Sequence, residues 1–183
     1  MKKWLGILLT ASLASCGGGD TTTNPANLVA KNDFESMDGW MGDAPAPSLT
    51  KEKAHSGLYS VSVRPGVDYG IGYSSLLGKM TPTRPQKIKL SAWVFVPSDQ
   101  ANANLVVEMR DPANPAAPPL LWQGIVLKKE VKKFNEWQQL EKVITLPAGA
   151  TAATSFKMYL WRTDSAVPVY LDDVVLALDN DAK

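Results

Sequence analysis

The sequence is poor in the residues that most catalytic centres need. Among its 183 residues there is one cysteine, Cys16, and one histidine, His55. A single cysteine excludes a disulfide within the chain, and a zinc centre would lack Cys and His ligands. A Ser-His-Asp triad would have to use His55, but no Gly-x-Ser-x-Gly sequence marks a nucleophilic serine. Residues 70–72 (GIG) lack the strand and helix that a phosphate-binding loop requires.

The sequence also lacks an excess of charge of either sign. Its 19 basic and 18 acidic side chains give a net charge of +1, so nothing points to nucleic acid or an anionic surface as a partner. Long apolar runs are missing too. The apolar stretch at residues 4–14 is much shorter than the roughly 20 residues that a membrane-spanning helix needs.

The N-terminus has the organisation of a secretory signal. A positive start, Met1-Lys2-Lys3, is followed by the apolar stretch and then by small residues. Leu13-Ala14-Ser15-Cys16 resembles the lipobox of bacterial lipoproteins. This resemblance implies that residues 1–15 are a signal peptide and that Cys16 becomes the acylated first residue. The alternative is an ordinary secreted protein with an unrelated cysteine.

The lipobox resemblance implies an exported protein, anchored by lipid to the membrane of the cell envelope. Gly17 stands where an Asp is associated with retention in the inner membrane, which favours the bacterial outer membrane. Removal of Lys2 and Lys3 leaves 17 basic and 18 acidic side chains, a net charge of −1. We expect a flexible tether at residues 16–27, one domain at 28–178 and a short tail at 179–183.

Period-two alternation of apolar and polar residues is frequent, whereas helical periodicity is weak. The clearest case is residues 88–96, in which every second side chain is aliphatic. Turn-forming segments such as 64–66, 97–99 and 111–115 separate the alternating stretches. The predicted strands cover residues 59–64, 88–96, 105–110, 120–127, 138–146, 156–161 and 169–178.

Many short strands separated by turns predict an all-β fold, a two-sheet antiparallel β-sandwich. Residues 128–135 (KKEVKKFN) resemble a helical turn in composition, but we interpret them as a loop or strand end.

Several short motifs occur in an order that points to a family. Residues 32–35 (NDFE) precede Gly39-Trp40, and 54–61 (AHSGLYSV), 91–94 (SAWV), Trp137 and 170–174 (YLDDV) follow. Together they resemble the galactose-binding-like jelly rolls, especially carbohydrate-binding modules of the family 4, 9 and 22 type. The resemblance covers residues 33–176, implies a jelly roll of two sheets, and assigns Trp40 and Trp137 to the core.

The resemblance also implies a structural calcium ion that ties the start of the domain to its last strand. Its ligands would be the backbone carbonyls of Asp33 and Gly57 and the side chains of Glu35 and Asp172. Calcium takes six to eight oxygen ligands of these kinds, often from residues far apart in sequence. The alternative is that Asp172 and Asp173 accept backbone hydrogen bonds at a sheet edge.

The outward residues of the predicted strands suggest where a sugar would bind. Aromatic rings stack on the C–H face of a pyranose, and charged neighbours bind its hydroxyls. The 111–119 loop would form the rim. The alternative is that a loop covers these rings or that they pack on one another. The predicted platform is Trp93, Tyr159 and Trp161, with Glu108 and Arg110 beside it and Trp122 and Gln123 as an extension.

The sequence therefore predicts a non-catalytic, lipid-anchored module that binds a polysaccharide or glycan. A jelly roll that contacts another envelope protein is the competing class, and it would show a broad apolar patch instead of a narrow aromatic strip. Paired carboxylates such as Glu108 and Glu141 leave a glycosidase open. Tyr159 with Arg110 leaves a polysaccharide lyase open.

Overall fold

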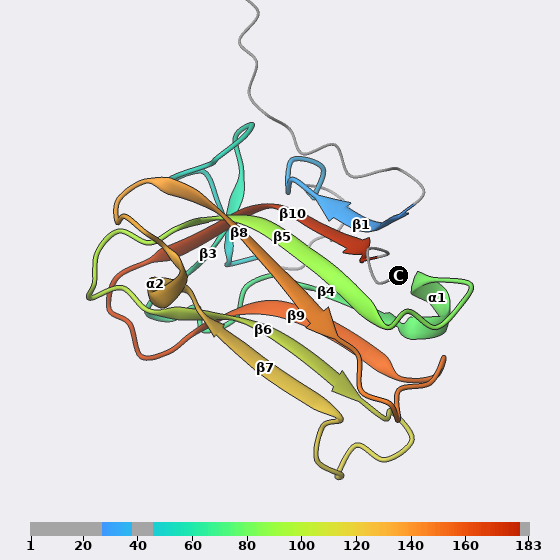
Figure 1. Cartoon of the computed structure of the whole chain (residues 1–183). Helices are drawn as coiled ribbons and strands as arrows, with labels where there is room; N and C mark the ends of the chain where they lie inside the picture. The colour runs from blue at the N-terminus through green and yellow to red at the C-terminus, as the bar shows by residue number, and fades with distance from the viewer. Residues whose placement is uncertain (1–26, 38–45, 180–183) are drawn as a thin grey trace, which may run out of the picture.

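The computed structural model describes residues 27–37 and 46–179, and these form two antiparallel β-sheets that lie face to face (Figure 1). The predicted signal peptide, Cys16 and Trp40 lie outside the described residues. The sandwich confirms the predicted all-β fold class.

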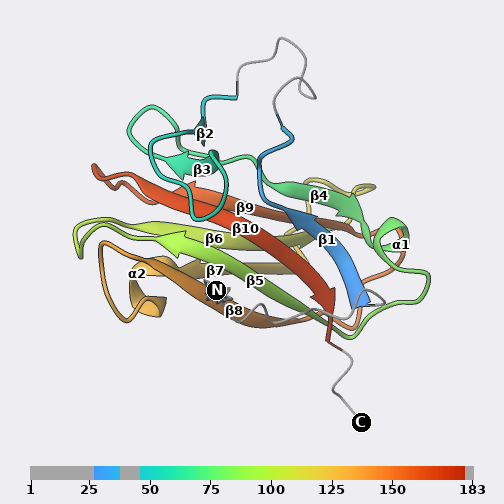
Figure 2. The ribbon, with the colours of Figure 1, turned by 90° about the horizontal axis from the view of Figure 1, so that it is seen from above.

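The larger sheet has six strands, with β10 at its centre. Its strands follow the order β2-β3-β10-β5-β8, and β1 pairs with β10 beyond the end of β3. Figure 2 shows β1 and β10 side by side, so the first and last strands of the sandwich are neighbours. The strands are β1 (Leu28–Asn32), β2 (Leu49–Thr50), β3 (Ser60–Val63), β5 (Lys87–Phe95), β8 (Trp137–Thr145) and β10 (Val169–Leu178).

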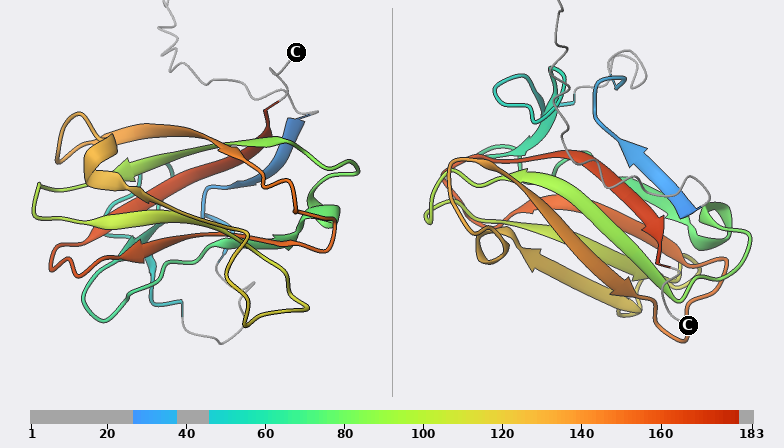
Figure 3. Two further views of the ribbon diagram at one scale, coloured as in Figure 1. Left: turned by 60° about the horizontal axis from the view of Figure 1, so that its bottom comes forward. Right: turned by 45° about the horizontal axis from the view of Figure 1, so that its top comes forward.

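The smaller sheet has four strands in the order β4-β9-β6-β7. These are β4 (Tyr73–Leu76), β6 (Ala103–Arg110), β7 (Leu121–Val126) and β9 (Ser155–Arg162). The chain crosses repeatedly between the two sheets, as in a jelly roll, and Figure 3 shows the sheets stacked from two directions. Two helices of four residues, α1 (Leu77–Met80) and α2 (Leu127–Glu130), follow β4 and β7. Neither of these helices could cross a membrane.

The core lies between the sheets because alternate residues of each strand turn inward. Ile88, Leu90, Ala92 and Val94 of β5 are each at most 1% exposed. The facing sheet contributes equivalent aliphatic residues from β6 and β9. This packing assigns every remaining residue of β6 and β9 to the outer face, which is where a binding surface can form.

All seven predicted strands are present, and β10 has the predicted bounds. The sequence was interpreted as a loop or strand end at residues 128–135. This was wrong for residues 128–130, because Leu127–Glu130 forms α2. The short strands β1, β2 and β4 were not predicted. They have two to five residues each, and no alternating stretch of the sequence marked them.

Candidate functional site

The outer face of the four-stranded sheet gathers aromatic and charged side chains from three strands. The register places Glu108 of β6 opposite Trp122 of β7, and Val106 opposite both Gly124 and Tyr159. Because neighbours in register share a face, five of the six predicted ligand-binding residues lie together. These are Glu108, Arg110, Trp122, Tyr159 and Trp161.

Four aromatic rings on this side form two edge-to-face pairs. The rings of Trp122 and Trp161 have centroids 6.2 Å apart at 77°, and those of Tyr69 and Tyr159 have centroids 5.9 Å apart at 62°. Trp122 is 47% exposed and Tyr69 is 62% exposed, so a ligand can reach both rings. We call the surface made by these four residues the aromatic face.

Gly124 of β7 leaves room for the indole of Trp122. A Cβ on Gly124 would stand 2.8 Å from Trp122 Cη2, so the indole lies over the glycine. Val106, the neighbour of Gly124 across the strands, points away from the core yet is fully buried. Rings therefore cover the backbone here, and the aromatic face is continuous from β7 to β9.

A charged cluster lies beside the rings. Arg110 Nε donates to Glu108 Oε1, and its Nη1 donates to the carbonyl of Ala117 in the predicted rim loop at 3.2 Å. The phenol of Tyr159 donates to Glu108 Oε2 at 3.5 Å. Burial, with the charge of Glu108 adding to it, raises the pKa of the Tyr159 hydroxyl above its ordinary value. The cluster thus holds oriented donors and acceptors of both charges next to an apolar surface.

Sequence reasoning missed Tyr69. It lies in the 64–72 connection, outside any predicted strand, and reaches the face through an isolated bridge to Trp161. Asp68 beside it is paired with Arg162 of β9, with 2.6 Å between Nε and Oδ1. The sequence signal was an aromatic residue in a turn-rich stretch, which does not show to which sheet the loop attaches.

The structure does not place Trp93 with the other five predicted residues. Trp93 belongs to β5 of the six-stranded sheet, so the core separates it from Tyr159 and Trp161. The imidazole of His55 covers its indole, with ring centroids 3.7 Å apart and planes 14° from parallel. The prediction of one platform containing Trp93 was therefore wrong, and the alternative of a covering loop applies to this residue.

The loop that carries His55 lies over several aromatic residues of the six-stranded sheet. Lys53 Nζ stands 4.6 Å from the centre of the Phe95 ring, and Tyr170 donates its hydroxyl to Glu52 Oε2 at 2.8 Å. Burial, together with Glu52, raises the pKa of Tyr170 to about 12. This sheet face is thus occupied by the protein's own loop.

Asp172, in the last strand β10, accepts hydrogen bonds from the same loop. It is fully buried, and its carboxylate accepts hydrogen bonds from the backbone N–H groups of His55 (2.8 Å), Ser56 (3.3 Å) and Asp173 (2.7 Å). A register shift in β10 between Asp172 and Val175 sets this part of the strand apart from its regular ladder. Burial raises the pKa of Asp172 to about 6, although the backbone donors oppose the shift.

Glu35 holds the other side of the loop. Its Oε1 accepts from the backbone N–H groups of Leu58 (2.8 Å) and Tyr59 (2.6 Å). A Cβ on Gly57, whose φ is +59°, would stand 2.3 Å from the Glu35 carboxylate carbon. Asp33 Oδ1 accepts from the N–H of Glu35 at 3.3 Å. Glu35, Gly57 and Asp172 therefore lie at or next to the loop at residues 55–59, and Asp33 is hydrogen-bonded to Glu35.

This donor set fits a calcium ion only if backbone carbonyls complete it. Within residues 27–37 and 46–179, no group of three or more His, Cys, Asp or Glu side chains could hold a metal. Asp172 and Glu35 use three and two of their roughly four acceptor sites each, so both keep capacity for a cation. A fully buried carboxylate without a basic partner also favours one.

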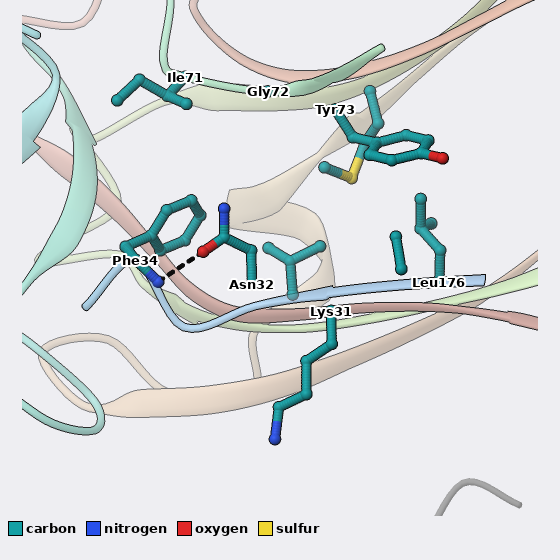
Figure 4. Close-up of a pocket in the computed structure, with 10 residues that line it drawn as sticks. Lys31, Asn32, Phe34, Ile71, Gly72, Tyr73 and Leu176 are labelled. Carbon is teal, nitrogen blue, oxygen red and sulfur yellow. Dashed lines mark hydrogen bonds between the residues drawn. The ribbon is translucent and has the colours of Figure 1, made fainter. Parts of the chain in front are cut away.

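A separate cavity of about 200 Å³ opens between β1 and β4, at the edge of the sandwich (Figure 4). Phe34, Ile71, Tyr73 and Leu176 line it, and the amide of Asn32 is engaged by the Phe34 N–H at 2.8 Å. Its lining has little to bind sugar hydroxyls, so the aromatic face is the better candidate.

The two sheets form an antiparallel β-sandwich, and comparison with known proteins shows where this fold occurs. No family model and no curated protein sequence matches the chain. Among solved structures, the C-terminal family 22 carbohydrate-binding module of Clostridium thermocellum Xyn10B is similar, with a TM-score of 0.57 at 17% identity. The similarity covers 86% of this chain and 96% of that one.

A second similar structure is the CBM22-2 xylan-binding domain of Paenibacillus barcinonensis Xyn10C. Its TM-score is 0.53 at 19% identity, over 82% of this chain and 99% of that one. A further xylan-binding domain of family 22 has a TM-score of 0.52 at 17% identity, over 85% and 97% of the two chains. The chain therefore has the jelly-roll fold of carbohydrate-binding modules, as the motif order predicted.

Proposed function

We propose that this protein binds a polysaccharide without modifying it, through the aromatic face and the Glu108–Arg110 pair. The observation that carries this proposal is the grouping of Trp122, Tyr159 and Trp161 on one sheet face next to oriented charges. Indole and phenol rings stack on the apolar face of a pyranose, and charged groups bind its hydroxyls. The similar structures that are described as xylan-binding support a polysaccharide as the ligand.

The distribution of exposed apolar residues supports a sugar over a protein partner. Among the described residues, the large exposed apolar side chains are Leu28, Leu58, Tyr69, Leu120, Trp122, Phe134 and Val143. Only Tyr69 and Trp122 of these belong to the aromatic face, and charged residues flank them. A protein interface would need a broader apolar patch.

The electrostatics of the face support binding without catalysis. A lyase would need Tyr159 as a base and Arg110 to neutralise a substrate carboxylate. The raised pKa keeps the Tyr159 phenol protonated at neutral pH, and the charge of Arg110 is already paired with Glu108. Tyr159 is therefore poorly suited to act as a base and Arg110 to neutralise a substrate carboxylate, while both groups can hydrogen-bond a sugar.

The test is a screen of the purified protein against a glycan array, followed by titration calorimetry with the polysaccharide that binds. Trp161→Ala should weaken binding at least tenfold, about 1.4 kcal/mol, with an unchanged circular dichroism spectrum. Val143→Ala, at an exposed position on the other sheet, is the control and should bind normally. If the folded protein bound no glycan on the array, a protein partner would be favoured. If Trp161→Ala bound normally, another surface would be favoured as the binding site.

We also propose a structural calcium ion at the loop of residues 55–59. Glu35 and Asp172 would supply side-chain oxygens, and Asp33 and Gly57 backbone carbonyls. The ion would supply the positive charge that the buried Asp172 lacks and would link the start of the domain to β10. In a fold without disulfides, such a link stabilises the folded state.

Calcium at one hundred times its Kd should stabilise the protein by about 2.7 kcal/mol, which raises its Tm by about 5–10 °C over the chelated protein. Glu35→Gln should lose most of this difference, whereas Asp111→Asn in the exposed rim loop should keep it. Equal Tm values with calcium and with chelator would exclude the ion.

The cellular setting of this function is a further proposal. We propose that the protein is exported and anchored to the cell envelope, in the bacterial outer membrane, through a lipid on Cys16. The support is the signal-like sequence and the Leu-Ala-Ser-Cys motif at residues 13–16. Mass spectrometry of the protein purified from membranes would test it, because acylation adds a mass that Cys16→Ser must abolish.

A further inference from the structure

Three unpartnered polar atoms gather at one end of the aromatic face. In the part of the chain that the structure describes, the buried side-chain oxygens and nitrogens without a hydrogen-bond partner are Asn102 Oδ1, Asn104 Oδ1 and Thr163 Oγ1. Native proteins leave few such atoms unpaired, and each costs free energy. Three of them in one place therefore need an explanation.

The strand register brings these residues together on the outer side of the sheet. Asn104 of β6 lies opposite Trp161 of β9, and Ala103 lies opposite Arg162. The next position of this antiparallel register pairs Asn102 with Thr163. Ala101, Ala103 and Leu105 turn into the core, so residues 102 and 104 face outward by alternation.

These polar residues continue the line of the aromatic face. Asn104 Nδ2 stands 3.1 Å from the position of a Cβ on Gly124, where the indole of Trp122 also lies. From Asn102 to Arg110, β6 and the residue before it extend about 26 Å. Along β6, the outer face thus has Glu108 and Arg110 at one end and Asn102, Asn104 and Thr163 at the other, and the rings of β7 and β9 flank the strand between them.

We propose that the polar end is a second part of the binding surface, where sugar residues beyond those on the rings donate hydroxyl hydrogens to Asn102, Asn104 and Thr163. This inference rests on the proposed function of the aromatic face. All three residues are half-buried, so turning a side chain about χ1 or χ2 brings its polar atom to a ligand. The polysaccharide then runs along β6, and not across the strands.

The chemistry of the polar end also restricts the ligand class. Amide oxygens only accept hydrogen bonds, and a hydroxyl of threonine accepts as well as donates. The hydroxyls of a neutral sugar can donate to them, whereas the carboxylate of an ionised uronate, which replaces a hydroxymethyl group, can only accept. At the opposite end Arg110 is paired with Glu108, and Lys157, opposite Glu108 in register, is exposed on the same face. The polar end itself therefore favours the hydroxyls of a neutral sugar over the carboxylate of a uronate.

The test uses Thr163→Val and Asn102→Ala in the full protein, with calorimetric titration of xylo-oligosaccharides from xylobiose to xylohexaose and of oligogalacturonates. The wild-type protein should gain affinity with length and bind the neutral series better. Each variant should lose about three- to tenfold in affinity for xylohexaose and little for the shortest binding oligomer. Thr145→Val, at an exposed position of β8, is the matched control.

A second measurement needs no ligand. Because valine has the shape of threonine without the unpartnered hydroxyl, Thr163→Val should raise the Tm of the free protein by about 2 °C or more, and Thr145→Val should not. A rise in Tm together with weaker binding of long oligomers supports the proposal.

Unchanged Tm, or xylohexaose affinity equal to that of the wild type, overturns it. If Trp161→Ala weakens binding while Thr163→Val and Asn102→Ala do not, the aromatic face keeps its proposed function and only the polar end is refuted. If the wild-type protein binds no glycan of either series or of the array, both proposals fail.

Discussion

The imidazole of His55 lies flat on the indole of Trp93, with ring centroids 3.7 Å apart, and its Nδ1 stands 2.6 Å from Asp173 Oδ2. The loop at residues 51–58 is therefore fastened to the six-stranded sheet by stacking and by a polar contact at the same residue. Because this loop covers the aromatic residues of the six-stranded sheet, the aromatic face of the four-stranded sheet is the one that a ligand can reach.

Trp93→Ala should destabilise the fold without affecting binding. Removal of the indole exposes His55 and the edge of Trp137, so the free energy of unfolding should fall by about 2–3 kcal/mol. Urea unfolding followed by circular dichroism would measure the loss. Affinity for polysaccharide should equal that of the wild type, in contrast to Trp161→Ala. A loss of affinity in Trp93→Ala together with normal binding by Trp161→Ala would place the sugar on the six-stranded sheet instead.

Gly124→Ala should weaken binding while leaving stability nearly unchanged. The new Cβ would stand 2.8 Å from Trp122 Cη2, so the indole must move from its place over β7. We expect a three- to tenfold loss of affinity, about 0.6–1.4 kcal/mol, by titration calorimetry. Gly149→Ala is the matched control because a Cβ there meets nothing within 4 Å. Equal affinities for the two variants would show that the position of Trp122 is irrelevant.

A comparison of Gly57→Ala with Gly66→Ala separates the cost of backbone strain from the cost of the contact with Glu35. Both glycines have positive φ, +59° and +84°, but a Cβ on Gly66 meets nothing within 4 Å. Gly66→Ala should therefore cost about 1–2 kcal/mol from strain alone. Gly57→Ala should cost clearly more and also displace the Glu35 carboxylate, so its Tm should no longer respond to calcium. Equal losses of stability would mean that Glu35 moves aside at no cost.

Tyr170 should make stability depend on alkaline pH. Its pKa is raised from 10.0 to about 12 in the folded state, so the folded state favours the neutral phenol. The resulting stabilisation is complete below pH 10 and is lost between pH 10 and 12, by up to about 2–3 kcal/mol. Tyr170→Phe should flatten this decline and lose about 1 kcal/mol at neutral pH. Chemical unfolding across this range tests it, and a decline as steep as that of the wild type would contradict it.

Alternation within strands was enough to predict which side chains point into the core and which point outward. For β5, β6 and β9 the inward and outward sets were right, because a two-residue period is a local property of an extended backbone. The same alternation could not assign a strand to a sheet. Trp93 and Trp161 both turn outward, but they do so on opposite sides of the sandwich.

Loops were the other source of error. Nothing within residues 51–58 or 64–72 indicates which sheet each loop meets, because that depends on partners about 90 to 120 positions away, such as Asp173 for His55 and Trp161 for Tyr69. The unpartnered atoms of Asn102, Asn104 and Thr163 were likewise not predictable, since a missing hydrogen bond is a property of the packed structure.

The sequence by itself determined the all-β class, seven of the ten described strands and their inward faces, because these follow from local periodicity and turn-forming residues. It also brought Glu35, Gly57 and Asp172 into one hypothesis through the order of their motifs. Only the tertiary structure decided that five of the six predicted residues form one surface, that His55 covers the sixth, and that Tyr69 joins them. Those outcomes depend on strand order and loop docking, which arise from long-range contacts that the local sequence does not encode.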